Sequence, residues 1–524
     1  MTKIDPTELP GGWSVASLAD IAEINPGLLK TEAADSLDVT FVPMLAIEAE
    51  TGKIDVSATR NFSQVKKGYT AFQEGDVLFA KITPCMENGK MAVVPALTNG
   101  LGFGSTEFHV LRPRAGIEAR FIYYFVSSLR FRHSAEHNMT GAVGQRRVPT
   151  KYLSEEIISL PPAQEQTRIV AKIEELFSEL DGGIQNLMAA REQLKVYRQS
   201  VLKYAFEGKL TSQWREDYPG KLQTPEQLLT SLKKEREERY KQQLTDWETD
   251  VKDWVLRGRK GKKPSKPRKP APVATKDTSL PDLPTGWVRV NVGDLNADIF
   301  DGPFGSNLKT SDYVDEGIRV IRLENVGYLE FIEAKRSYVT PEKYETLKGH
   351  AVSSGDIIFS SFVTDGIRVV VLPDTIRRAI NKADCFCVRL YGELVRNDYV
   401  ASFLSTQAAY KQIEATIHGI GRPRINTTQL KGFTLPLCSA HEQREIMLQL
   451  NEKLSVADSI DASISQEIAR CEALRQSILQ KAFSGKLIAQ DQNDEPASVL
   501  LERIKTAKAD KENDKKNHGK RKAA

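Results

Sequence analysis

Two polar turns in this sequence carry side chains of the kind that contact nucleic acids. They contribute Asn88 and Lys90 from residues 83–90, and Ser306, Asn307 and Lys309 from residues 301–309. The second turn, DGPFGSNLK, is rich in glycine, which lets the backbone approach a ligand closely. Amide, hydroxyl and ammonium groups suit base edges and phosphates. Both turns are therefore candidate sites of readout; the alternative is that they are ordinary surface turns.

Two pairs of arginines stand at matching places, each shortly before a long helical pattern. They are Arg146 with Arg147, and Arg422 with Arg424. The planar fork of a guanidinium group suits phosphate and guanine. We expect these four side chains to hold nucleic acid mainly through phosphates, which supply affinity more than sequence choice. The alternative is that they are salt-bridged surface residues.

Signatures of catalysis or metal binding are missing from the sequence. It contains no GxxxxGK[ST] loop for a nucleoside triphosphate. His133 and His137 are four residues apart, but no acidic residue follows His133 in the HExxH manner, so surface histidines are expected. The five cysteines form no CxxC pair, which argues against a zinc knuckle and fits a reducing compartment. We expect neither catalysis nor a metal ion on this chain.

Length and charge predict several domains with one unusual linker. A chain of 524 residues with 40% hydrophobic and 27% charged residues suggests three or four domains. The net charge is only +4, yet residues 257–269, RGRKGKKPSKPRK, are densely basic. We expect this run to be solvated and mobile, with nonspecific attraction to nucleic acid as the functional alternative. No signal peptide or long apolar stretch is evident, so we expect a cytoplasmic protein without membrane contact.

An internal repeat organises the chain. Residues 198–210, RQSVLKYAFEGKL, return as RQSILQKAFSGKL at 475–487, with nine of thirteen positions identical. Shorter segments return in the same order: LPGGW as LPTGW, GDVLF as GDIIF, GQRRV as GRPRI, and the dipeptide EQ. The stretches between these segments share little beyond pattern. The sequence therefore predicts one scaffold used twice with two different recognition surfaces.

Each copy of the repeat closes a long helical pattern with apolar residues at alternating steps of three and four. The expected seam is Ile169, Ile173, Leu176, Leu180, Leu187, Leu194 and Val201 in the first helix, and Ile446, Leu450, Ile460, Ile464, Leu474 and Ile478 in the second. Such a seam is typical of a coiled coil. We expect the two helices to pack on each other, because both seams are long and too narrow to cover a globular core. The alternative is that each helix packs on its own domain.

Short β-type runs bounded by turn residues fill both globular regions. In the first region a helix is expected at 121–132, and in the second at 399–417. The fold class is therefore α+β: two similar globular domains with a mixed or antiparallel sheet, joined by two long helices that pack as a coiled coil, in an internal repeat. Trp247 and Trp254 lie seven residues apart on a charged helix after the first repeat, hence on one face.

The set of motifs resembles the specificity subunits of Type I restriction-modification systems. The residues that carry the resemblance are the LPxGW heads, the TPCxENGK turn, the segment DGPFGSxLKxxDY, the EQxxI helix starts and the RQSxLxxAFxGKL helix ends. The match covers nearly the whole chain, and the duplicated set in this order is far more specific than any single motif. The long charged stretch 233–281 departs from the compact central region of the family.

The resemblance implies a subunit that recognises DNA and performs no catalysis. Each target-recognition domain would read one half of a bipartite, asymmetric site on double-stranded DNA. The two long helices would pack as an antiparallel coiled coil with pseudo-twofold symmetry and fix the spacer between the halves. Two modification subunits would bring S-adenosylmethionine and adenine methylation, and two restriction subunits would bring ATP- and Mg²⁺-dependent translocation and cleavage. The runner-up function is a coiled-coil scaffold whose two domains bind proteins or glycans.

The expected domain order follows from the repeat and the resemblance together. It runs from a first target-recognition domain (1–162) and first long helix (163–210) through a charged helical extension (211–256) and a basic Lys/Pro-rich linker (257–282) to a second target-recognition domain (283–439), second long helix (440–487) and charged tail (488–524).

Overall fold

The computed structural model describes residues 9–27, 34–142, 144–273, 282–364, 366–415, 417 and 423–521. The chain divides into two units, one formed by Met1–Met188 with Ile464–Ala524 and the other by Ala189–Ser463. Two helices of 44 residues, α6 (Ala163–Phe206) and α13 (Ala440–Phe483), each contribute to both units. Each unit therefore holds one globular region, the first part of the long helix that follows it, and the last part of the other long helix.

The globular region of the first unit is built on three small sheets. Their strand orders are β1–β10, β2–β9–β6–β7 and β4–β3–β8–β5. The strands are β1 (Ser14–Ser17), β2 (Ala22–Ile24), β3 (Asp38–Val42), β4 (Thr59–Asn61), β5 (Thr70–Phe72), β6 (Val77–Ala80), β7 (Met91–Val93), β8 (Gly102–Gly104), β9 (Phe108–Pro113) and β10 (Ile157–Leu160). All neighbours pair antiparallel except β3 and β8, which are parallel.

The second unit repeats this topology although its sequence differs. Its strand orders are β11–β21, β12–β20–β17–β18 and β13–β15–β14–β19–β16, and again one pair, β14 with β19, is parallel. The strands are β11 (Val288–Asn291), β12 (Ala297–Phe300), β13 (Tyr313–Val314), β14 (Ile318–Ile321), β15 (Tyr338–Val339), β16 (Ala351–Val352), β17 (Ile357–Ser360), β18 (Val369–Val371), β19 (Ala379–Asn381), β20 (Cys385–Leu390) and β21 (Thr434–Leu437). The predicted α+β class with a duplicated mixed-sheet domain is confirmed.

Further helices of varied length accompany the sheets in each unit, and the structure corrects two of the helices predicted from the sequence. The first unit has α1 (Leu18–Ile21), α2 (Phe62–Val65), α3 (Ala119–Ser127), α4 (Leu129–His137), α5 (Thr150–Glu155) and α14 (Ala497–Arg521); the second has α7 (Ser212–Asp217), α8 (Pro225–Leu256), α9 (Pro341–Thr346), α10 (Asn397–Leu404), α11 (Gln407–Glu414) and α12 (Thr427–Lys431). The single helices expected at 121–132 and 399–417 are each broken in two. Ser128 and Thr406 adopt extended backbone, and their hydroxyls cap the helix that follows.

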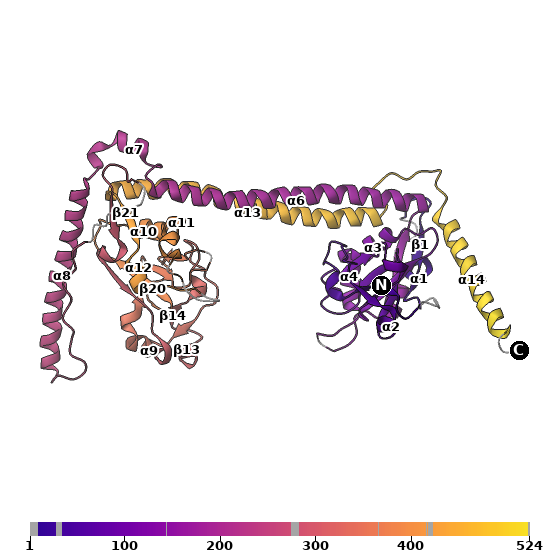
Figure 1. Ribbon diagram of the computed structural model, residues 1–524, viewed down its shortest axis with the longest axis horizontal. Helices are drawn as coiled ribbons and strands as arrows, with labels where there is room; N and C mark the ends of the chain where they lie inside the picture. Colours follow the sequence, from indigo (N-terminus) through magenta and orange to yellow (C-terminus); the bar gives the residue numbers. More distant parts are fainter. Residues whose placement is uncertain are drawn as a thin grey trace. The chain divides into compact units, whose positions relative to one another are not determined.

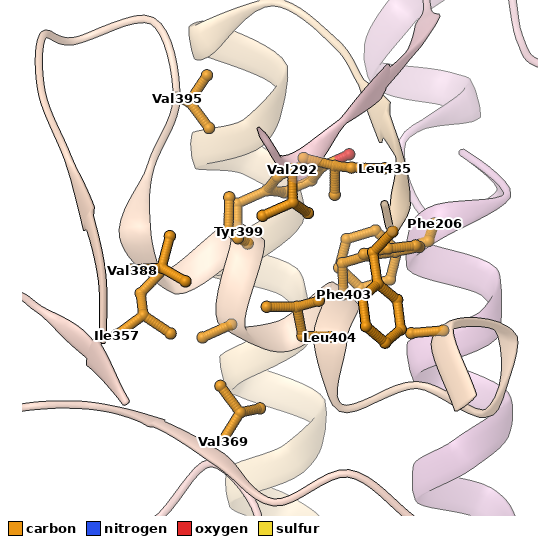
Figure 2. Packing of buried hydrophobic residues seen from close by; sticks show 14 of the residues in the cluster. Phe206, Val292, Ile357, Val369, Val388, Val395, Tyr399, Phe403, Leu404 and Leu435 are labelled. Carbon is orange, nitrogen blue, oxygen red and sulfur yellow. The ribbon is translucent and has the colours of Figure 1, made fainter. Parts of the chain in front are cut away.

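Each core joins a globular region to the long helices. In the second unit Phe206, near the end of α6, packs against Tyr399 and Phe403 of α10, with ring centroids 5.1 and 5.4 Å apart (Figure 2). In the first unit Phe483, at the end of α13, packs in the same way against Phe121 and Phe125 of α3. Each globular region is thus fastened to the end of the helix that belongs, in sequence, to the other repeat.

The repeated head and helix-end motifs meet at these junctions. Gly485 and Gly208 end the long helices with φ of +67° and +71°. A Cβ on Gly485 would lie 2.2 Å from the Pro10 ring, and one on Gly208 would lie 2.4 Å from the Pro284 ring. Glycine is therefore required twice over at each helix end, by the backbone conformation and by the close approach of the LPxGW head.

Within each unit, α6 and α13 lie side by side and run antiparallel (Figure 1). Ion pairs between the helices join Arg191 to Asp461 at 2.9 Å, Arg198 to Asp458 at 2.8 Å, and Asp181 to Arg475. An offset of 277 residues converts the Arg198–Asp458 pair into the Arg475–Asp181 pair, so the repeat extends to these side chains. The predicted antiparallel pairing of the two helices is confirmed.

The seam itself differs from the prediction at two positions. Ile169, Ile173, Leu194, Val201, Ile446, Leu450 and Ile464 are buried, and Leu176, Leu180, Leu187 and Ile478 are half-buried. Ile460 and Leu474, by contrast, are 46% and 44% exposed. The steps of three and four pass instead through their neighbours Asp461 and Arg475, which are half-buried and form the ion pairs with α6. An apolar pattern alone misses such positions, because a charged residue can occupy a seam when its partner lies opposite.

Candidate nucleic-acid interface

Three loops of the first unit meet around the turn at 83–90. The Thr83 N–H donates to the Arg146 carbonyl at 3.0 Å, which joins the turn to the loop before α5. On the other side, the Glu50 N–H donates to the Gly89 carbonyl at 3.1 Å. The Lys90 ammonium donates to the carbonyls of Met44 and Ile47. The sequence predicted two separate candidate sites here, and the fold brings them together.

Asn88 and Lys90 have different roles in this arrangement. The Asn88 side chain is exposed at the tip of the turn, where its amide is accessible to a ligand. The Lys90 ammonium lies 3.2 and 2.9 Å from two backbone carbonyls and is half-buried. Two carbonyl acceptors satisfy most of the donors of an ammonium group. Lys90 thus stabilises the loop through these hydrogen bonds, and Asn88 remains the better candidate for a direct contact with nucleic acid.

The first arginine pair also separates into two roles. Arg147 donates from Nε and Nη2 to both carboxylate oxygens of Glu107, at 2.9 and 2.8 Å. This bidentate bond raises the pKa of Arg147 and lowers the pKa of Glu107. Arg146 is held more loosely, since its nearest carboxylate oxygens, on Glu87 and Glu136, lie 3.8 and 3.9 Å away. A phosphate could recruit Arg146 without breaking a short ion pair.

The second unit forms a corresponding group around the loop at 301–309. One oxygen of Asp301 accepts the N–H groups of Gly302 and Asp384, and burial raises the pKa of this carboxyl. The Asp384 side chain in turn accepts from Ser361 at 3.2 Å and from Arg424 at 3.3 Å. The glycine-rich loop and the second arginine position, 120 residues apart in sequence, thus lie beside one another.

Asn307 and Lys309 are exposed on this loop, and Lys309 also donates its backbone N–H to Asp312. Ser306 lies in a 3₁₀ turn, Gly305–Asn307. The Arg424 guanidinium pairs with Asp384 and lies 5.0 Å from the Phe362 ring centroid. Arg422 lies outside the described residues. In the second set, Asn307, Lys309 and Arg424 are exposed, and of these three Arg424 is held by an ion pair with a carboxylate.

Exposed apolar side chains on the same loops were not anticipated from the sequence. Leu45 is 90% exposed in the 3₁₀ turn Met44–Ala46, in which the Met44 carbonyl accepts from Lys90. Phe304 is 61% exposed in the glycine-rich loop. Apolar groups on such loops suit thymine methyl groups or insertion between base steps. A hydrophobic residue in a sequence is normally predicted to lie in the core, so only the folded structure shows that Leu45 and Phe304 are exposed.

Structural roles explain the other repeated residues. Asp76 and Asp356, from the two GD motifs, each accept a bidentate bond from an arginine on the adjacent strand, Arg112 and Arg389 respectively. Among the described residues, no group of three or more His, Cys, Asp and Glu side chains could hold a metal ion. No helix in the described part of the chain is long and apolar enough to cross a membrane.

Comparison with known proteins agrees with this architecture. The family model for the Type I restriction modification DNA specificity domain matches residues 10–188. The chain is 26% identical over 508 residues to the Type I restriction enzyme EcoAI specificity subunit of Escherichia coli, covering 87% of this chain and 80% of that protein. It is 23% identical to the EcoKI specificity subunit of Escherichia coli strain K12, covering 96% of this chain and 97% of that protein.

Solved structures show the same fold. A chain from a study of complex assembly and conformational transition of the type I R-M system aligns with a TM-score of 0.63 and 20% identity, over 91% of this chain and 99% of that one. The HsdS subunit from Thermoanaerobacter tengcongensis aligns with a TM-score of 0.50 and 20% identity, over 93% of this chain and all of that one. With its duplicated α+β domain, paired long helices and this set of relatives, the chain is similar to the specificity subunits of Type I restriction-modification systems, and residues 10–188 match their DNA specificity domain.

Proposed function

We propose that this chain is the DNA-recognition subunit of a Type I restriction-modification complex and that each globular domain reads one half of a bipartite, asymmetric site. One observation carries the proposal: the same framework of sheets occurs twice, while the candidate contacts lie on different loops of it, at 83–90 between β6 and β7 in the first domain and at 301–309 between β12 and β13 in the second. Two identical domains would recognise a symmetric DNA site, whereas two domains with the same framework and different contact residues recognise an asymmetric one.

The roles of individual side chains follow from their surroundings. Arg146, whose ion pairs are long, supplies a phosphate contact that positions the first domain. Asn88 in the first domain, and Asn307 and Lys309 in the second, are exposed donors and acceptors for base edges. Arg147 and Arg424 shape their loops through ion pairs with carboxylates. Base choice thus depends on a few exposed side chains in each domain, whereas the arginines act mainly on affinity.

The paired helices are proposed to set the spacer between the half-sites. A helix of 44 residues is about 66 Å long at 1.5 Å per residue. Three ion pairs between α6 and α13 oppose a slip of one helix along the other, because each slip would leave charged seam residues without partners. Helix length and register together would then define one allowed spacing.

Catalysis belongs to partner subunits in this proposal. Two modification subunits with S-adenosylmethionine would methylate adenine, and two restriction subunits would use ATP and Mg²⁺ to translocate and cleave DNA. The proposed boundaries are those expected from the sequence, with recognition domains at 1–162 and 283–439. The relatives, which are all specificity subunits of restriction enzymes, do not favour the alternative of a scaffold that binds proteins or glycans.

The test is a domain exchange read out by methylation. Residues 288–418 are replaced by the equivalent segment of a relative, the chain is expressed with its modification partner, and methylated adenines are mapped across the host genome by sequencing. We expect one half-site to change while the other half-site and the spacer persist. Replacing residues 14–140 is the matched control and should change the opposite half. An unaltered motif in both hybrids would overturn the proposal.

A further inference from the structure

The segment after α8 lies against that helix and forms an arm with it, a contact that the sequence did not predict. Residues 261–273 run back along α8 (Figure 1). The Trp254 indole N–H donates to the Gly261 carbonyl at 3.2 Å, and the Trp247 indole N–H donates to the Pro264 carbonyl at 3.1 Å. The two tryptophans lie on one face of α8, as the sequence predicted, and they bind the returning segment.

The spacing of the two tryptophans along α8 matches the spacing of the two carbonyls that they bind. Trp247 and Trp254 are seven residues apart on a helix, which spans about 10.5 Å. The carbonyls that they bind are three residues apart, which spans about 9.3 Å in a polyproline II conformation. Pro264, Pro267 and Pro270 are half-buried while the residues between them are exposed, as expected for three residues per turn. The prolines therefore form one column that faces α8.

The base of the arm is fixed to the second globular domain. Leu228 and Leu232 of α8 are buried in its core, and Val273 packs against the same core. Glu235 accepts the N–H groups of Glu393 and Leu394, both at 3.3 Å. One turn further along α8, Arg239 pairs with Asp298 at 2.6 Å. Both α8 and the segment that returns along it are thus held in place at the end that joins the domain.

The columns that remain exposed are cationic. Beyond the turn that ends α8, one is Lys263, Lys266 and Lys269, and the other contains Lys262 and Arg268; Arg259 and Lys260 lie at the turn itself, where Arg259 has a φ of +61°. Together with Arg257 they place eight cations and no acidic residue in 257–269. Since the whole chain has a net charge of +4, the residues outside this segment sum to −4. No described residue supplies an ion pair to any of the eight; Lys266 lies 5.6 Å from the Trp247 ring centroid. The arm concentrates positive charge and leaves it unneutralised.

We propose that the two cationic columns of residues 257–269 bind the phosphate backbone of double-stranded DNA without regard to sequence, as a second contact beside the half-site that the second domain reads. A duplex presents a regular array of phosphates, and a row of cations whose backbone positions repeat every three residues, about 9.3 Å in a polyproline II conformation, can release counterions from several of them at once. The columns carry no exposed aromatic or amide group that could read bases. The choice of DNA as the ligand rests on the proposed function.

The experiment measures DNA affinity of the complex with its modification partner as a function of salt. The test variant is K260Q/K263Q/K269Q, which spares the prolines and Lys266. The matched control is K233Q/K241Q/K252Q, which removes the same charge from exposed lysines of α8 that are interspersed with carboxylates. The probes are a duplex of about 60 base pairs that contains the methylated motif and the same duplex with the motif scrambled.

We expect the test variant to bind both probes more weakly and to keep the ratio between them. If three phosphate contacts are lost, the slope of log K against log salt becomes less steep by about 2.7. Between about 50 and 200 mM salt, the affinity of the wild-type complex then falls roughly 40-fold more than that of the variant. The control should follow the wild type, and the methylated motif should be the same in all three proteins.

Three results would overturn the proposal. Equal slopes for the wild type and the test variant would mean that the lysines do not meet phosphates. An equal loss in the control would mean that the effect is one of net charge. Weaker assembly with the modification partner in the absence of DNA, at an unchanged DNA slope, would assign the arm to an acidic protein surface. A complex that binds neither probe, or binds both alike, would instead contradict the proposed function.

Discussion

A buried carboxylate at the start of each long helix provides a sharp test of the structure. Glu442 accepts the Trp287 indole N–H at 3.0 Å, the Thr211 hydroxyl at 2.8 Å and the Arg215 guanidinium at 2.7 Å. Its counterpart Glu165 accepts the Trp13 indole N–H at 3.1 Å and has only a weak second bond, at 3.4 Å, from Gln490. We propose to replace each glutamate by glutamine, which preserves volume and removes the charge.

The expected cost differs between the two sites because only one holds an ion pair. In E442Q the half-buried Arg215 loses its buried counter-charge, and one of three donors is left without an acceptor. Loss of a charged hydrogen bond costs about 1.5–3 kcal/mol and a broken buried pair about 3–5 kcal/mol, so we expect about 3 kcal/mol. In E165Q the amide oxygen still accepts from Trp13, and burial already raises the pKa of Glu165, so we expect about 1 kcal/mol.

Hydrogen exchange measured by mass spectrometry separates the two sites, since it reports local opening in each unit. At 1.4 kcal/mol per tenfold, amides of 283–292 and 204–215 in E442Q should exchange about 150-fold faster than in the wild type. Amides of 10–17 and 163–170 in E165Q should exchange only about 5-fold faster. Equal losses in the two variants, or a larger loss in E165Q, would refute the argument that the Arg215 ion pair distinguishes the junctions.

Further predictions test the seam, the arm and the loop. I464K should destabilise the helix pair by about 3 kcal/mol because its side chain is buried, whereas L474K should change stability by less than about 0.5 kcal/mol, as measured by thermal unfolding; the reverse order would contradict the seam. W247F/W254F lacks both indole bonds to the arm, so trypsin should cleave 257–269 severalfold faster than in the wild type, and an unchanged rate would show that these bonds do not hold it. R146A should weaken binding to all DNA and make the salt slope less steep by about 0.9; a changed methylation motif instead would assign Arg146 to readout.

The repeat shows where sequence and structure carry the same information. Glycine at the helix ends, the LPxGW heads and the EQ dipeptides were visible in sequence as repeated segments, and the structure gives each a contact: Gly485 with Pro10, and Glu165 with Trp13. These residues repeat because two junctions of the same geometry each require them. Local chemistry of this kind, a positive φ or a buried acceptor, constrains residue type strongly enough to be read from the chain alone.

The candidate DNA contacts could be predicted only in part. The sequence selected polar residues on turns, and Asn88, Asn307 and Lys309 do lie on exposed loops. It could not reveal that Lys90 is bound by two carbonyls or Arg147 by Glu107, because these partners come from distant segments. It also missed Phe304, since an apolar residue on an exposed loop has the same sequence signal as one in a core.

The amino-acid sequence by itself determined the duplication, the α+β class and the pairing of two long helices, because these depend on periodic patterns and on repeated local requirements; the antiparallel orientation came from the family resemblance. Tertiary structure alone decided which charges fill the seam, which helix end closes each domain, and that a basic, proline-rich run is fastened to two tryptophans of α8. The physical reason is the same in each case: a charge, a ring or a donor acquires its role from the partner that the fold places opposite it, and that partner is remote in the chain.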